Sequence, residues 1–77
     1  MDSDREKTVI KEFGERLKKF RDERNLSLRD LGHLADIDFG NINEIEKGKI
    51  NPSLTTIVAL AEALKISPSQ FFHDNLV

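Results

Sequence analysis

The stretch from Leu26 to Phe72 constrains the fold most strongly, because its apolar residues recur every three or four positions between closely spaced turn and capping residues. This spacing is typical of amphipathic helices, which bury one apolar face. No segment alternates apolar and polar residues with a period of two, so no strand is predicted. The predicted fold class is therefore all-α, with short helices joined by tight turns.

Five helices are predicted, and capping residues mark their ends. The first covers about residues 8–24. Ser27 and Asp30 have the spacing of a capping box, so the second helix is expected over 28–35, with Asp36 as a left-handed turn residue.

The remaining helices follow in the same way. Asp38 is placed to cap a third helix that ends near Lys47, before a left-handed Gly48. Ser53 caps a fourth helix, whose apolar stripe runs from Leu54 to Leu64. The segment 67–70 has a cap serine, a proline at the first helical position and a glutamine at the capping-box position, so a short fifth helix is predicted.

The chain has 77 residues and is expected to form one small domain over residues 8–77, after a disordered N-terminus over residues 1–7. There is no cysteine, so no disulfide or thiolate metal site is available. His33 and His73 lie far apart, which disfavours a metal site. No apolar run approaches the ~20 residues of a membrane span, and the charged N-terminus lacks the pattern of a signal peptide. We expect a cytoplasmic protein.

The sequence contains no recognisable catalytic motif. It has no Ser/His/Asp group at the spacing of a catalytic triad and no glycine-rich phosphate loop, and the small core leaves little room for a substrate pocket. We therefore expect a non-enzyme without a cofactor. No effector domain is attached, so no small-molecule effector is expected.

The net charge of −2 is unusual for a protein that binds nucleic acid. Its distribution is uneven. Residues 11–24 are locally basic, whereas residues 26–46 carry Arg29 alone against five acidic residues. Phosphate neutralisation is therefore limited, and we expect the affinity for DNA to depend only weakly on salt.

The segment from Leu26 to Phe72 resembles the phage-repressor and Cro-type helix-turn-helix domains, the XRE family. The matching positions are Leu31, Gly32, Ala35 and Ile37 around the turn, Ile42 and Ile45 in the third helix, Glu46-Lys47-Gly48-Lys49 after it, and Asn51-Pro52-Ser53-Leu54. The resemblance implies a compact five-helix, lambda-repressor-like DNA-binding domain with its helix-turn-helix motif at about residues 28–47.

The resemblance also implies how DNA is bound. The third helix would lie in the major groove while the second crosses the backbone, and two subunits would read two half-sites. The positions that would face base edges are Phe39, Gly40, Asn41, Asn43 and Glu44. Asparagine can pair with adenine, glutamate can accept from cytosine, and Phe39 can pack on a thymine methyl group. The alternative for the asparagines is a solvated helix face.

Phosphate contacts are implied for Leu28, through the backbone N–H groups at the start of its helix, and for Lys47, Lys49 and Asn51. The alternative for the lysines is ordinary surface charge. Many relatives carry polar or basic residues where this chain has Leu28 and Phe39. Either these two side chains pack together across the turn, or Phe39 is an additional core residue.

Two further roles are assigned. The resemblance implies an ion pair between Arg21 and Glu46 that braces the third helix against the first. The apolar residues Phe71, Phe72, Leu76 and Val77 are either core or the interface of a homodimer, and we expect part of them to be covered by a second subunit.

The leading functional hypothesis is a sequence-specific transcriptional regulator, such as a stand-alone repressor or a restriction-modification controller-like protein. It would bind double-stranded DNA as a homodimer on a palindromic operator. One alternative is a protein-interaction module that keeps the helix-turn-helix fold but binds DNA weakly or not at all. Another is an antitoxin-like partner that binds both protein and DNA.

Overall fold

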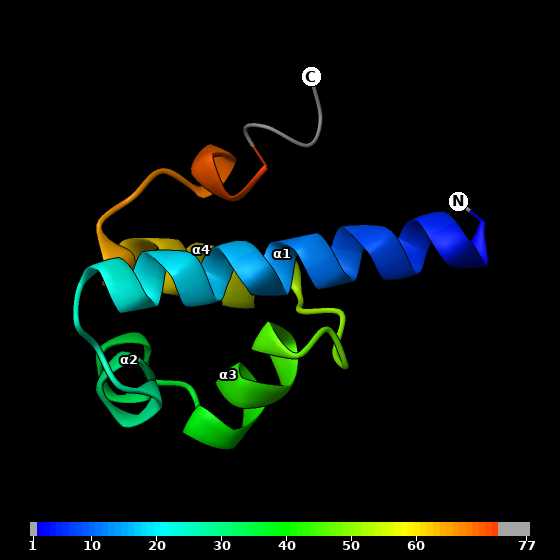
Figure 1. The fold of residues 1–77 in the computed structure, drawn as a ribbon. Helices are drawn as coiled ribbons and strands as arrows, with labels where there is room; N and C mark the ends of the chain where they lie inside the picture. Colours follow the sequence, from blue (N-terminus) through cyan, green and yellow to red (C-terminus); the bar gives the residue numbers. More distant parts are fainter. Residues whose placement is uncertain (1, 73–77) are drawn as a thin grey trace.

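The computed structural model describes residues 2–72, which form four α-helices and one short 3-10 helix (Figure 1). The elements are α1 (Ser3–Glu23), α2 (Leu28–Ala35), α3 (Phe39–Glu46), α4 (Leu54–Leu64) and η1 (Pro68–Phe71). No strand is present among these residues, and the predicted all-α class is confirmed. None of the helices in residues 2–72 is long and apolar enough to cross a membrane.

The prediction of five helices is wrong in its last element, because the fifth segment is a 3-10 helix rather than an α-helix. The predicted caps are nevertheless present: Ser67 and Gln70 form a capping box, and Pro68 occupies the first helical position. The backbone N–H of Gln70 donates to the carbonyl of Ser67 at 2.9 Å. A segment of four residues is too short to propagate α-helical hydrogen bonds, and 3-10 geometry suits it.

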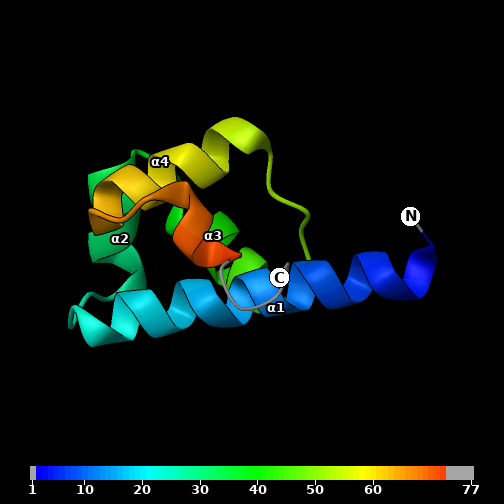
Figure 2. The same ribbon diagram turned by 90° about the horizontal axis from the view of Figure 1, so that it is seen from above.

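Helix α1 starts earlier than the predicted Thr8, at Ser3, so residues 3–7 are helical where a disordered segment was predicted. The side chain of Asp2 caps the helix by accepting a hydrogen bond from the N–H of Arg5 at 2.8 Å. With 21 residues, α1 is roughly 31 Å long and runs along the 34 Å longest dimension of the molecule. Figures 1 and 2 show its N-terminal end extending past the other helices.

The core lies where the apolar faces of all five elements meet. Helices α2 and α3 lie on one side of α1 and η1 lies on the other (Figure 1). The buried apolar side chains are Phe13, Leu17, Leu31, Ile42, Ile45, Leu60, Ala61, Leu64 and Phe71. Because α3 contributes two of them, the core holds the position of that helix.

Phe71 belongs to this core and not to a dimer interface. Its side chain is fully buried, and its ring centroid lies 4.7 Å from that of Phe13 and 5.8 Å from that of Phe20. It cannot contact a second subunit without leaving the core, so its predicted interface role is wrong. Phe72 is half-buried, and its ring lies 5.8 Å from Phe13. The predicted interface residues Leu76 and Val77 lie outside the described residues.

Asp30 makes the stability of α2 dependent on pH. The backbone N–H of Ser27 donates to its carboxylate at 2.9 Å, and this hydrogen bond lowers the pKa of Asp30 below its ordinary value. The unfolded chain, with a pKa of about 3.9, takes up the proton first as the pH falls. The stabilisation is therefore complete above about pH 5 and is lost as the pH falls through the unfolded pKa toward the lower pKa of the folded state.

We expect Asp30→Asn to remove this part of the acid sensitivity. The measurement is the free energy of unfolding between pH 2.5 and 6, in which the variant should lose less stability on acidification than the wild-type protein. Asp36→Asn is the matched control, because Asp36 is an exposed aspartate at the opposite, C-terminal end of the same helix and takes no part in the capping box. Equal slopes for wild type and Asp30→Asn would contradict the role of the capping box.

Candidate nucleic-acid interface

The joint between α2 and α3 is a tight left-handed turn. Asp36 has φ 56° and ψ 46°, and the backbone N–H of Ile37 donates to the carbonyl of Gly32 at 3.0 Å. A Cβ atom on Gly32 would lie 2.7 Å from the carbonyl oxygen of Ile37, which no ordinary contact allows. Gly32 therefore permits the close approach of the two helices.

Helix α3 presents one face to the core and the other to solvent. Ile42 and Ile45 have 0% and 2% of their surface exposed. The five predicted base-reading residues all lie on this helix, and they differ in exposure. Phe39 and Asn41 are exposed, whereas Gly40, Asn43 and Glu44 are half-buried. The most exposed of the predicted base-reading residues therefore lie in the first turn of α3.

The four predicted phosphate-contacting residues flank α3. Leu28 is the first residue of α2 and is half-buried, because its side chain packs against the core. Lys47, Lys49 and Asn51 are exposed in the segment that follows α3. This arrangement leaves the lysine ammonium groups and the Asn51 amide on the surface, while Leu28 offers no polar side-chain group.

Phe39 is 42% exposed, so its predicted role as an additional core residue is wrong. Its packing against Leu28 across the turn stays a prediction. The ring of Phe39 lies under the guanidinium of Arg29. The distance from the Arg29 Cζ to the ring centroid is 4.8 Å, within the range of a cation–π interaction. Arg29 is not among the site residues predicted from the sequence. The signal that could have identified it is its position as the lone lysine or arginine of segment 26–46.

The acidic residues near α3 are mostly engaged within the protein. The carboxylates of Asp30 and Asp38 each accept a hydrogen bond from a backbone N–H at a helix start, at 2.9 and 3.3 Å. Glu46 turns inward, with 5% of its side chain exposed. Glu44 lies 3.8 Å from the ammonium of Lys49. Local pairing therefore reduces the negative field that the composition suggests at this surface.

The predicted pair of Arg21 and Glu46 is present as a two-point ion pair. Arg21 Nε and Nη2 donate to the two carboxylate oxygens of Glu46 at 2.7 and 2.9 Å. Arg21 Nη1 also donates to the carbonyl of Leu26 at 2.8 Å. The hydrogen bond to Glu46 raises the pKa of Arg21 above its ordinary value. The pair joins α1 to the last turn of α3 and fixes the end of that helix.

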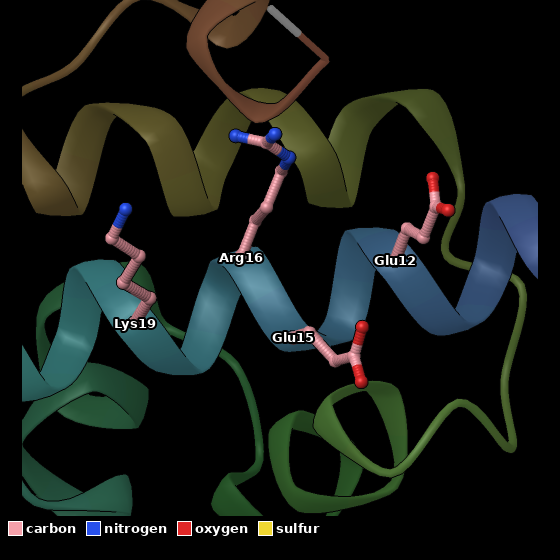
Figure 3. A pocket seen from close by; sticks show the side chains of 4 residues that line it. All are labelled: Glu12, Glu15, Arg16 and Lys19. Carbon is pink, nitrogen blue, oxygen red and sulfur yellow. The ribbon is translucent and has the colours of Figure 1, made fainter. Parts of the chain in front are cut away.

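Two hollows lie on the surface of residues 2–72, and one of them borders α3. One of about 320 Å³ is lined by Glu12, Glu15, Arg16 and Lys19 of α1. In Figure 3, Arg16, Lys19 and Glu12 point to the side of α1 on which η1 lies, and Glu15 points to the opposite side. A smaller hollow of about 170 Å³ lies between α3 and the start of α4 and includes Asn41 and Asn51 in its wall. The hollow beside α3 is smaller than the roughly 300–1,000 Å³ of a typical small-molecule site, so this face suits a groove of DNA better than a small molecule.

Two helices packed across a short turn, the second of them exposed along one face, define the helix-turn-helix class of DNA-binding domains. The comparisons with known proteins agree with this class. The model of the helix-turn-helix family HTH_3 matches residues 17–71. The chain belongs to this family, whose members are DNA-binding transcription regulators. No curated protein sequence matches the chain.

Solved structures show the same fold. The restriction-modification controller protein C.AhdI from Aeromonas hydrophila is 36% identical, with a TM-score of 0.81 over 82% of this chain and 96% of that one. An HTH_3 family transcriptional regulator from Vibrio cholerae is 27% identical, with a TM-score of 0.86 over 91% of this chain and 39% of that one. The clp gene regulator ClgR from Corynebacterium glutamicum is 23% identical, with a TM-score of 0.82 over 86% of this chain and 70% of that one, a likeness of fold alone.

Proposed function

We propose that this protein is a sequence-specific transcriptional regulator that binds a palindromic operator as a homodimer, with α3 in the major groove. The observation that carries the proposal is the exposed face of α3, whose opposite face is anchored by Ile42, Ile45 and the Glu46 ion pair. A reading helix must be held rigidly relative to the backbone contacts, and this anchoring provides the rigidity. The similarity to C.AhdI over nearly its whole length supports a controller-like role.

The dimer is proposed to form through the surface of α4 and Phe72. Leu54 is 76% exposed and Val58 is 37% exposed, and the two lie one turn apart on α4. Phe72 is half-buried and directly follows η1. A small domain gains stability when a second copy covers exposed apolar side chains of this kind.

A second candidate function is a protein-interaction module with weak DNA binding. The observation that favours it is Leu34, which is 57% exposed on α2. A partner protein that covers α2 would occupy the surface next to α3. The two functions differ in their response to DNA.

Selection from a random-sequence duplex library distinguishes the two, with sedimentation of the selected complex to count its subunits. Enrichment of an inverted repeat bound by two chains is the result expected for the operator-binding regulator. Recovery of no DNA at low or moderate salt would contradict it and select the interaction module. Recovery of a single half-site bound by one chain would contradict the dimer.

Lys47→Ala is expected to weaken binding to all sequences to a similar extent. The residue is exposed directly after α3, where the proposed complex places it against a phosphate, and one lost phosphate contact reduces the salt slope by about 1. The measurement is the dissociation constant on the selected operator and on a scrambled duplex at several salt concentrations. Lys19→Ala is the matched control, because Lys19 lies on α1 beside Arg16 and away from α3 (Figure 3). An unchanged salt slope for Lys47→Ala would contradict the phosphate contact.

A further inference from the structure

Arg29 and Phe39 form a contact that joins the start of α2 to the start of α3. Arg29 is the second residue of α2, and Phe39 is the first residue of α3. The guanidinium lies 4.8 Å above the ring centroid, and both side chains are exposed. The cation is therefore held at the N-terminal end of the exposed helix rather than free in solvent.

The ring of Phe39 is itself held in place. A Cβ atom added to Gly32 would lie 3.3 Å from the Phe39 Cβ, which shows how closely Phe39 sits against α2. Asp38 caps α3 directly before it and accepts a hydrogen bond from the N–H of Gly40. The first turn of α3 is thus fixed, and the aromatic face offered to Arg29 has a defined direction.

The hydrogen-bond donors of Arg29 are not used within the described residues. Its guanidinium makes no ion pair with any carboxylate of residues 2–72. The adjacent carboxylate, Asp30, is engaged by the N–H of Ser27 in the capping box. A cation–π contact with an aromatic ring leaves the N–H groups of the guanidinium available for an external acceptor. An oriented planar donor of this kind fits two acceptors that lie side by side.

We propose that Arg29 and Phe39 act as one base-reading unit, in which Phe39 positions the guanidinium of Arg29 to donate to O6 and N7 of a guanine in each half-site. The inference rests on the proposed function, because it requires α3 to enter the major groove. N-terminal residues of the reading helix contact base edges, and Arg29 reaches the same place from α2 because it stacks on Phe39. Arginine on guanine is the commonest base-specific pair, because the two N–H groups match the two acceptors. Arg29 is the specificity-determining residue, and Phe39 is a positioning residue.

The test uses the full chain and the operator recovered by selection. Dissociation constants are measured on a set of duplexes in which each base pair of the half-site is replaced in turn. The wild-type protein should lose roughly 10-fold or more in affinity when one particular G·C pair is replaced. For Arg29→Lys and Arg29→Ala, replacement of that G·C pair should change the dissociation constant less than it does for the wild-type protein. Replacement of the other base pairs should change it as much as in the wild-type protein.

Phe39→Leu tests the positioning role, since leucine keeps an apolar side chain but has no aromatic face. It should weaken the discrimination at the same G·C pair and leave Arg29 chemically intact. Lys47→Ala is the matched control, with a uniform loss on every duplex. Thermal melting of each variant checks the fold, and because both side chains are exposed, little change is expected.

Three outcomes would overturn the inference while leaving the proposed function intact. A uniform loss for Arg29→Ala on every duplex would make Arg29 a phosphate contact, and an unchanged affinity would make it a surface residue. Phe39→Leu with full discrimination at the G·C pair would remove the positioning role. If the wild-type protein selects no DNA, the proposed function itself fails, and the inference fails with it.

Discussion

Gly14→Ala is expected to lower the free energy of unfolding by about 3 kcal/mol, although alanine normally stabilises the interior of a helix by about 1 kcal/mol over glycine. Gly14 is buried in the middle of α1, where that helix crosses the end of α3. An added Cβ would overlap the carbonyl oxygen of Ile45 and lie 2.8 Å from that of Glu46. Both atoms belong to the backbone and cannot rotate away, so the two helices must separate.

The matched control for this substitution is Gly40→Ala in α3. A Cβ there would lie 3.5 Å from a carboxylate oxygen of Asp38, an ordinary contact with a movable side chain. We expect a change of less than about 1 kcal/mol. The measurement is thermal unfolding, in which a loss of 3 kcal/mol lowers the melting temperature by roughly 12–24 °C in a domain of this size. If Gly14→Ala melts like the wild-type protein, the close crossing of α1 and α3 is wrong.

The sequence predicts best those features of the fold that depend on hydrogen bonds between near neighbours. Helix α2 has the predicted bounds, α4 begins directly after its predicted cap Ser53, and Asp36 has the predicted left-handed backbone. The capping boxes at Ser27 and Ser67 are also present. Each of these depends on groups within about four residues, so the spacing of residue types is enough to identify them.

Features that depend on distant parts of the chain could not be predicted in the same way. Phe71 is buried because it meets Phe13 and Phe20 of α1, and no local pattern distinguishes a core phenylalanine from an interface phenylalanine. The start of α1 could not be predicted for a different reason. The N-terminal residues are charged and have no apolar spacing, so no pattern marks Asp2 as the cap of this helix. The helix begins where the Asp2 side chain accepts a hydrogen bond from the N–H of Arg5.

The scaffold of the candidate site was predicted better than its surface chemistry. The structure contains the predicted turn between α2 and α3 and the predicted buried face of α3, and Lys47 and Lys49 are exposed after that helix. The stacking of Arg29 on Phe39 depends on the angle between α2 and α3, and a sequence does not give that angle. The same applies to the acidic residues of segment 26–46, of which two pair with a cation and two accept hydrogen bonds from backbone N–H groups at helix starts.

Glu46→Ala is expected to destabilise the fold by about 3 kcal/mol and to leave base preference unchanged. The side chains of Arg21 and Glu46 are 11% and 5% exposed, so removal of the carboxylate leaves a largely buried guanidinium without its main partner. Glu62→Ala is the matched control, because Glu62 is exposed on α4, and it should change stability by less than about 0.5 kcal/mol. The measurements are denaturant unfolding and selection of the operator by each variant.

The double variant Arg21→Met with Glu46→Leu separates two contributions to the free energy of unfolding. One is the cost of leaving Arg21 buried without a partner, and the other is the stabilisation that the ion pair itself provides. Replacement of both charges by apolar side chains of similar size removes the uncompensated charge, so the double variant should be more stable than Glu46→Ala. A double variant no more stable than Glu46→Ala would show that the pair itself contributes strongly, through its two hydrogen bonds. An unchanged unfolding midpoint for Glu46→Ala would show that the position of α3 does not depend on this ion pair.

The selected operator tests the second part of the prediction. The pair lies on the inner side of α3, so base preference should not change. An altered operator for a folded Glu46→Ala variant would contradict this and would mean that the ion pair sets the angle at which α3 enters the groove.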